Sequence, residues 1–206
     1  MPRWLWLLLL GSMAALWLAG RGGQAPLTGQ PACPPPPRFT DAAEPMQSAL
    51  PGNFKPFRHG KATITPLAGF SLQARVLSRE NYSWGPESNY SPTDLALGWG
   101  PMAAPGLAEQ LHVSQGGRWY RYSWSGQGPP LPLAQIIGNS ANMHMVPADR
   151  AVADRLADID AGDVVRVHGW LVRIEGDGGW RWTSSMSRQD SGSGSCELVL
   201  VCSIER

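Results

Sequence analysis

The segment GNSANMHMVPAD, residues 138–149, combines a histidine with a serine and two asparagines. A histidine can act as a general base when a nucleophile or a carboxylate lies beside it. His144 is the histidine of this segment, and Ser140 or Asp190 could supply its partner in a hydrolase. The same residue types also suit a turn, because Ser and Asn side chains bond to nearby backbone groups. We therefore expect a loop that enters a following helix, with hydrolysis as the alternative.

A second candidate is the polar segment SSMSRQDSGSGSCE, residues 184–197, which follows two tryptophans. Arg188 and Asp190 are two residues apart, so both could point to one face at the end of a strand. Trp180 and Trp182 precede them, and Trp and Arg anchor binding interfaces more often than most residues. We predict that these four residues form a binding face. The structural alternative is a hairpin loop that carries a surface ion pair.

The sequence indicates neither a metal site nor a cofactor site. A zinc site would need paired histidines, as in HxH or HExxH, or two cysteines at ligand spacing. The cysteines lack that spacing, and the four histidines are scattered at His59, His112, His144 and His168. The Gly/Ser-rich part of the second segment lacks the Lys-Ser/Thr pair and the helix of a phosphate-binding loop. We expect no metal and no cofactor.

The charge balance disfavours a nucleic-acid partner. The chain has 17 Lys and Arg against 16 Asp and Glu. Without Arg3 and Arg21, which flank the N-terminal apolar run, 15 basic side chains face the same 16 acidic ones. Binding to a phosphate backbone requires clustered positive charge, and a net charge of −1 does not provide it.

The N-terminal sequence predicts a membrane anchor. Residues 4–20 contain no charged side chain, and as a helix they would span ~26 Å, just short of a bilayer core. Tryptophans lie near both ends of the run, as they do at membrane interfaces. We predict a single-pass signal-anchor over residues 1–21, with the C-terminal domain facing the periplasm or the exterior. The alternative is a cleaved signal peptide and a secreted protein.

A Gly/Pro-rich spacer and an irregular segment are expected over residues 22–60, which contain PPPP at 34–37. An exported chain can form disulfides. Cys196 and Cys202 would lie ~20 Å apart if the run between them is a strand, which is too far for a bond. Cys33 could pair with either of them, or all three could remain thiols.

From residue 61 the apolar residues alternate with polar ones, and this pattern predicts a β-rich domain. Strands are expected over residues 61–67, 70–79, 117–126, 133–138, 163–176, 180–188 and 196–205. Capping signals predict short helices over 91–98 and 105–113 and a longer helix over 147–163 that Asp149 can cap.

The expected domain, residues 61–206, is mainly β (α+β). A helix between the third and fourth strands of a small antiparallel barrel is the arrangement of an OB-fold, here with a short helical insertion. The alternatives are a split β-sandwich and an SH3-like barrel. The segments NMHMVPAD, GDVVRVHGWLV and WTSSMSRQDSGSGSCE resemble an uncharacterised family of membrane-anchored or secreted bacterial proteins with an OB-like β-barrel. The resemblance spans about residues 70–206. It implies no known activity, so it assigns no catalytic residue.

Two classes of function remain open. The first is a non-catalytic envelope module that binds a protein or glycan partner, because many aromatic residues lie on predicted strands. The second is the hydrolase. The chain lacks a recognisable carboxylate pair, metal set or nucleophile motif, so we favour the binding module.

Overall fold

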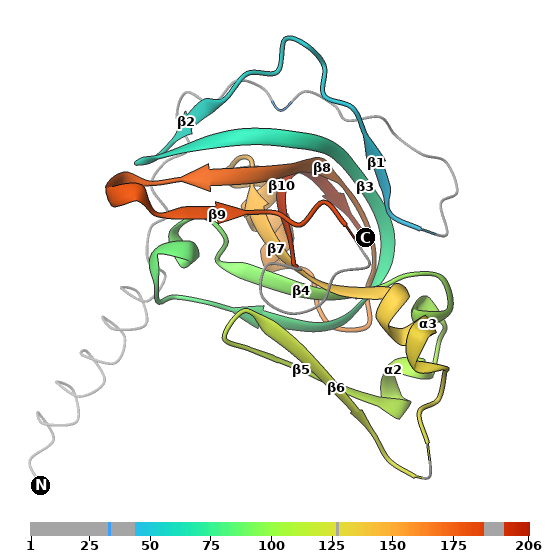
Figure 1. Cartoon of the computed structure of the whole chain (residues 1–206). Coiled ribbons are helices and arrows are strands. Elements are labelled where there is room, and N and C mark those ends of the chain that lie inside the picture. The colour runs from blue at the N-terminus through green and yellow to red at the C-terminus, as the bar shows by residue number, and fades with distance from the viewer. Residues whose placement is uncertain (1–32, 34–43, 127, 188–195) are drawn as a thin grey trace, which may run out of the picture.

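The computed structural model describes residues 33, 44–126, 128–187 and 196–206 (Figure 1). The described part is mostly β, as predicted. An eight-stranded sheet contains β1 (Met46–Ser48), β2 (Phe57–His59), β3 (Ala62–Asn81), β4 (Thr93–Gly98), β7 (Ser140–Pro147), β8 (Val164–Glu175), β9 (Arg181–Thr183) and β10 (Glu197–Glu205). A two-stranded sheet contains β5 (Leu111–Gly116) and β6 (Trp119–Trp124). The helical elements are α2 (Leu107–Gln110), α3 (Leu133–Gly138), α4 (Arg150–Ala157) and the 3-10 turns η1 (Pro86–Asn89), η2 (Gly100–Ala103) and η3 (Asp177–Gly179).

Five strands of the larger sheet pair in a circuit. β3 pairs with β4, β4 with β7, β7 with β10, β10 with β8, and β8 pairs again with β3. The β7–β10 pair is parallel, and the other four pairs are antiparallel. β1 and β2 pair with β3, and β9 pairs with β8. The mainly antiparallel sheet that the alternating pattern predicts is therefore present.

β3 is one long strand, where the sequence predicted two strands over residues 61–67 and 70–79. Its register with β8 shifts just after Pro66, and such an irregularity lets a strand bend. Past the bend, Phe70 and Leu72 point into the main hydrophobic core. The bend lets the same strand pair with β8 and then with β4, so β3 curves around the core (Figure 1).

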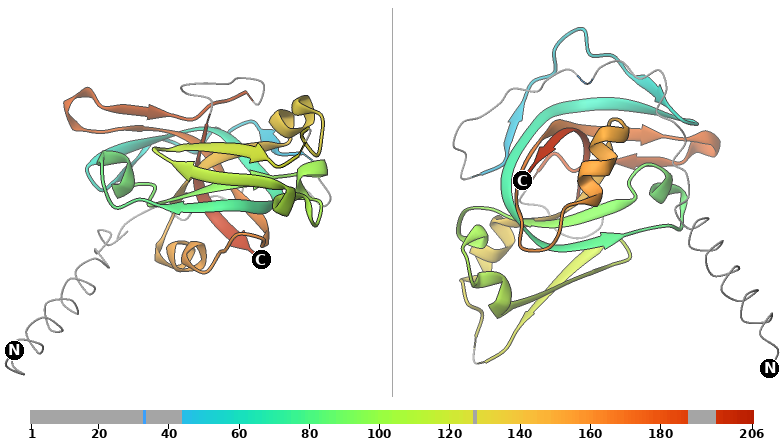
Figure 2. Two further views of the ribbon diagram at one scale, coloured as in Figure 1. Left: turned by 90° about the horizontal axis from the view of Figure 1, so that it is seen from below. Right: turned by 180° about the vertical axis from the view of Figure 1, so that it is seen from behind.

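The main core lies inside this curve, and α4 packs over one end of it (Figure 2). Val152, Leu156 and Ile159 contribute to the core from the helix and the turn after it. Asp149 caps the helix, because its side chain accepts a hydrogen bond of 2.8 Å from the amide of Val152. The sequence predicted this helix and its cap, although the helix is shorter than residues 147–163.

The β5–β6 hairpin covers part of the outer surface of the curved sheet (Figures 1 and 2). It packs over β3 and β4 through a separate apolar cluster. The buried members of this cluster are Leu77, Ala96, Met102, Leu107, Leu111 and Ile136. Tyr120, Tyr122 and Trp124 of β6 pack against it from the hairpin.

The residues that precede the long strand also join the sheet. Residues 46–48 and 57–59 pair with β3, within a segment expected to be irregular. Phe54 lies between them and packs edge-on against Trp170, with ring centroids 4.8 Å apart. The domain boundary after residue 60 stays a prediction. The expected anchor, residues 1–21, lies outside the described residues, and no helix among the described ones is long and apolar enough to cross a membrane.

The helix expected over residues 91–98 is wrong, because this segment contains strand β4. Ser91 and Pro92 resemble a helix start, but every residue of β4 is buried between β3 and β7. Leu95 and Leu97 point into the main core, as alternate residues of a strand do. Pairing on both sides outweighs the local helix signal.

Two neighbouring predictions, a strand followed by a loop, are both wrong. Residues 133–138, expected to be a strand, form helix α3, and the expected loop at 139–148 contains strand β7. A short apolar run such as LAQIIG does not distinguish strand from helix, and Pro132 at its start suits a helix. The helix expected over residues 105–113 is only the four-residue α2, which leads directly into β5.

Gly169 lies where three strands approach closely. It pairs with Phe70 of β3 and Val201 of β10. A Cβ atom at this position would collide with the backbone carbonyl oxygen of Leu200. The close approach of β8 to β10 therefore depends on the absence of a side chain at this position.

A disulfide joins Cys33 to Cys202 of β10, with Cα atoms 5.6 Å apart. The sequence left the partner of Cys33 open between Cys196 and Cys202. Cys196 lies outside this disulfide, and its sulfur is 3.9 Å from the carbonyl oxygen of Arg118. The disulfide fixes residue 33 to the outer surface of the sheet, although 169 positions separate the two cysteines in the sequence.

We predict that Cys33→Ser lowers the free energy of unfolding by ~2–5 kcal/mol, because the disulfide closes a very long loop in the unfolded chain. Denaturant unfolding with and without a reductant measures the change. The matched control is Cys196→Ser, which should remain as sensitive to the reductant as the wild type. A wild-type midpoint that does not change on reduction would contradict the prediction.

We predict that Gly169→Ala destabilises the fold by at least ~1–3 kcal/mol, because backbone atoms must move to admit the methyl group. Gly116→Ala is the control, since no atom lies within 4 Å of a Cβ there. Thermal unfolding of both variants provides the comparison. Equal melting temperatures for the two variants would show that β8 and β10 tolerate separation at Gly169.

Candidate functional site

His144 lies on strand β7, and its side chain faces a buried carboxylate. The residue is only 3% exposed. Its Nδ1 atom is 2.9 Å from Oδ2 of Asp94, which stands directly opposite on β4. The two atoms are close, but the contact lacks the alignment of a good hydrogen bond. The expectation that His144 lies in a loop is wrong.

Asp94 is the centre of a polar cluster on the outer surface of the sheet. Its side chain has no exposed surface. Arg118 Nη1 lies 2.7 Å from Oδ1, and the amide nitrogen of Asn142 donates to Oδ2 at 3.2 Å. Gln115 in turn donates to Asn142 Oδ1 at 2.6 Å. A buried carboxylate is tolerated only when partners replace the water it has lost, and these contacts do so.

The pairing of β4 with β7 explains why these side chains meet. Asp94 is opposite His144, and Ala96 is opposite Asn142. Side chains of directly paired residues lie on the same face of a sheet. Leu95 and Met143 occupy the other face and point into the main core. The polar cluster and the core are therefore opposite sides of the same strand pair.

Arg118 reaches the cluster from the tip of the β5–β6 hairpin. Gly117 and Arg118 form its two-residue turn, with φ of 61° and 70°, as in a type I′ turn. A left-handed backbone costs a non-glycine residue ~1–2 kcal/mol. Compensating contacts hold the tip in place: Nη1 donates to the carbonyl of Ser91 at 2.9 Å, and the backbone amide donates to the hydroxyl of Tyr82 at 3.1 Å.

The guanidinium of Arg118 lies between two aromatic rings. Its central carbon is 3.9 Å from the ring centroid of Tyr82 and 5.4 Å from that of Trp182. Trp182 also packs against His144, with centroids 4.7 Å apart. Burial raises the pKa of Tyr82, so its hydroxyl stays neutral at pH 7.

A row of aromatic rings continues from this point, and we call Trp182, Trp180, Tyr90 and His59 the aromatic row. Neighbouring ring centroids are 6.3, 5.8 and 5.8 Å apart in that order. Burial lowers the pKa of His59, so the end of the row is uncharged at pH 7. The two tryptophans and Tyr90 are half-buried and pack against a second apolar cluster on the outer surface of the sheet, which we call the outer-face apolar cluster. Its buried members are Ala62, Ile64, Val146, Ala148, Trp170, Val172, Ile174, Leu198 and Leu200.

The arrangement around His144 offers little for hydrolysis. Asp94 could orient the imidazole, as the carboxylate of a catalytic triad does. Ser140 is four residues away along the same strand, or ~13 Å. Its hydroxyl donates to the carbonyl of Ile136 at 2.6 Å and lies 3.0 Å from the hydroxyl of Tyr120. The structure therefore does not bring Ser140 to His144, and Asp190 lies outside the described residues.

The predicted binding face stays a prediction, because the structure describes only two of its four residues. These are Trp180 and Trp182, whose ring centroids are 6.3 Å apart. Arg188 and Asp190 lie outside the described residues. The sequence did not indicate the cluster around Asp94 and Arg118, because Asp94 lies within residues 91–98, where a helix is predicted. The turn sequence GGRW directly before the aromatic-rich strand β6 was the available signal for Arg118.

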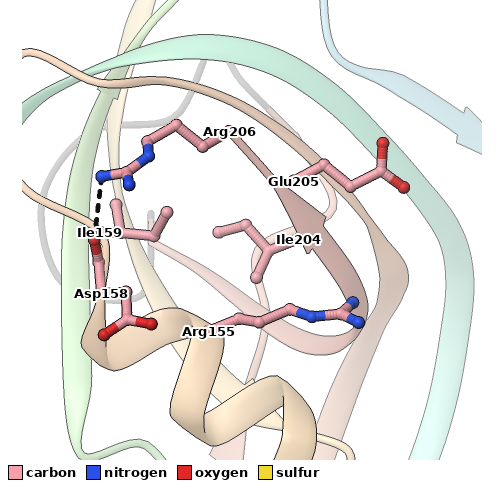
Figure 3. Close-up of a pocket in the computed structure, with 6 residues that line it drawn as sticks. All are labelled: Arg155, Asp158, Ile159, Ile204, Glu205 and Arg206. Atoms are coloured by element: carbon pink, nitrogen blue, oxygen red, sulfur yellow. Dashed lines mark hydrogen bonds between the residues drawn. The ribbon is translucent and has the colours of Figure 1, made fainter.

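A shallow hollow of about 380 Å³ lies elsewhere, at the opposite end of β10 (Figure 3). Its lining residues are Arg155, Asp158, Ile159, Ile204, Glu205 and Arg206. Arg206 Nη1 is bound to the backbone carbonyl of Asp158 and lies 3.3 Å from the carboxylate of Asp163. The hollow shares no residue with the polar cluster. Across the described ranges no group of three or more His, Cys, Asp or Glu could hold a metal ion.

We predict that Arg118→Ala lowers the free energy of unfolding by ~3–5 kcal/mol, because it leaves the carboxylate of Asp94 buried without its main cationic partner. Arg121→Ala, on the exposed face of the same hairpin, should change it by less than ~0.5 kcal/mol. Chemical denaturation of both variants tests this expectation.

A double-mutant cycle separates the ion pair from simple loss of packing. Asp94→Asn removes the buried charge, so adding Arg118→Ala to it should cost less than Arg118→Ala alone. Strictly additive effects would show that Arg118 does not act through Asp94.

No family model matches the chain, and no curated protein or solved structure is detectably similar to it. The resemblance to an uncharacterised bacterial family therefore stays a prediction.

Proposed function

We propose that this protein is a membrane-anchored, non-catalytic envelope module that binds a protein or glycan partner. The binding face would be centred on Arg118 and Trp182 and would extend along the aromatic row through Trp180. Arg188 and Asp190 are proposed to border it, because they follow β9 in the sequence. The N-terminal segment would be a single-pass anchor, with the folded domain in the periplasm or outside the cell.

The domain is proposed to be an OB-like barrel. The circuit β3–β4–β7–β10–β8–β3, with α4 between β7 and β8, supports this inference. It has the helix after the third strand of the circuit and a return to the first strand, as an OB-fold does. Proteins of that fold commonly bind ligands on one sheet face and its adjoining loops. Arg118 and Trp182 lie against such a face.

The observation that carries the proposal is the fixed position of the Arg118 guanidinium between Tyr82 and Trp182. Arginine and tryptophan held rigidly before binding lose little conformational entropy on association. The left-handed backbone at Arg118 is strained, and strained residues cluster at functional sites. A purely structural ion pair would not require the half-buried ring of Trp182 beside it.

An exported location is supported by the Cys33–Cys202 disulfide, because such bonds persist in oxidising compartments. The near-zero balance of charge argues against a nucleic-acid partner. Neither argument separates a protein partner from a glycan, since aromatic rings contact both.

A hydrolase remains the second candidate because of one contact, the close approach of His144 to Asp94. The imidazole is buried beside Trp182, and the proposed nucleophile Ser140 is engaged elsewhere. A hydrolase of this kind would require Trp182 to move before a substrate could reach His144. The binding module requires no such movement.

Crosslinking of the full chain in cells, followed by identification of the captured partner, tests the proposal. Trp182→Ala and Arg188→Ala should each reduce capture at least ~10-fold, as the loss of an interface anchor does. Trp119→Ala is the matched control, because this tryptophan is 39% exposed but lies on the hairpin, outside the aromatic row.

Thermal unfolding shows whether each variant is still folded. A second, more conservative variant separates the loss of binding from the loss of folding. Trp182→Phe retains an aromatic ring against His144, so it should fold and still bind less partner than the wild type. Capture that is equal in the wild type, Trp182→Phe and Arg188→Ala would place the binding face elsewhere. Turnover of a panel of ester and glycoside substrates, lost in His144→Gln, would favour the hydrolase instead.

A further inference from the structure

One end of the domain carries three loops that lie side by side (Figures 1 and 2). They are the β2–β3 turn, the segment around η1 and the β8–β9 turn. Tyr90 after η1 stacks on Trp180 at the base of the β8–β9 turn and touches His59 before the β2–β3 turn. We call this set of loops the loop end.

Trp84 projects from the loop end and is 89% exposed, more than any other large apolar side chain among the described residues. The ring is amphipathic, and tryptophan is enriched where proteins meet the lipid headgroup region. Tyr90 and Trp180 lie behind it as half-buried rings. We propose that the loop end rests on the surface of the bilayer and that Trp84 inserts into the headgroup region. This inference rests on the anchored part of the proposed function.

The length of the chain outside the structure favours the bilayer as the occupant. The disulfide fixes Cys33 to the domain, so only residues 22–32 separate it from the end of the predicted anchor. That segment spans at most ~40 Å when fully extended. A domain of this size is itself ~40 Å across. The domain therefore cannot move away from the membrane by more than about its own diameter.

The tether also keeps the domain close to the bilayer. Cys33 is bonded to Cys202, and it packs against the same outer-face apolar cluster as Tyr90 and Trp180. As the spacer that the sequence predicts, residues 22–32 would have a root-mean-square extension of only ~20 Å. The bilayer is then always at high effective concentration, so a weak contact by one tryptophan is enough to orient the domain.

Charge contributes little to the proposed contact. The loop end carries Arg58, Lys61, Arg173 and Arg181 against Glu87, Glu175 and Asp177. Glu175 is paired with Arg173 and Arg181 at 3.2 and 3.1 Å. A nearly balanced surface is not attracted strongly to anionic lipid. Contact with the bilayer should therefore be similar on zwitterionic and on anionic membranes and should persist at high salt.

Photo-crosslinking of the full chain tests the contact. The variants are Trp84→p-benzoylphenylalanine and, as a matched control, Ile137→p-benzoylphenylalanine on α3 away from the loop end. Ile137 is 50% exposed, so both positions are accessible. Each variant is reconstituted into phosphatidylcholine vesicles, with and without phosphatidylglycerol, and irradiated. Mass spectrometry should find lipid adducts several-fold more abundant at position 84 than at 137, in both lipid mixtures.

Other outcomes would overturn the proposal. Lipid adducts that are absent from position 84, or equally abundant at both positions, would show that the loop end does not face the bilayer. Irradiation in native membranes that yields only protein adducts at position 84 would assign this end to a protein partner. Vesicle flotation is measured separately: a full chain that does not float with the vesicles refutes the anchor, and one that floats without adducts at position 84 refutes only the contact.

Discussion

The carboxylate of Asp94 is fully buried, and much of the outer architecture follows from the need to neutralise it. Its partners come from two places in the chain: His144 and Asn142 on the neighbouring strand, and Arg118 at the tip of a separate hairpin. An unpaired charge in this position would be very costly. The hairpin is therefore held over the sheet by an ion pair at its tip and by apolar packing along its length.

The same constraint makes the candidate binding face rigid. Arg118 is fixed by Asp94, by the carbonyl of Ser91 and by the ring of Tyr82 before any ligand arrives. Trp182 is fixed in turn by Arg118 and His144. The buried imidazole of His144 therefore packs between the carboxylate of Asp94 and the ring of Trp182. Groups that are held in place in this way lose little conformational entropy when a ligand binds.

The curvature of the sheet is the second requirement, because it lets five strands pair in a circuit around one core. A long bent strand, β3, and the close approach at Gly169 make that curvature possible. The disulfide then attaches Cys33 to the outer surface. Trp84 of the loop end is exposed, whereas the two tryptophans and Tyr90 of the aromatic row are half-buried.

The sequence by itself determined the β-rich class, the helix capped by Asp149 and the long strand around Gly169. These features depend on the alternation of apolar and polar residues, on capping residues and on the spacing of apolar residues in a helix, all of which are local in the sequence. It did not determine that residues 93–98 and 140–147 are strands, because their neighbours in the sheet come from distant parts of the chain. It also could not place Arg118 against Asp94. A buried charge shows its partners only when the tertiary structure brings them together, and the local pattern around Asp94 indicated a helix start instead.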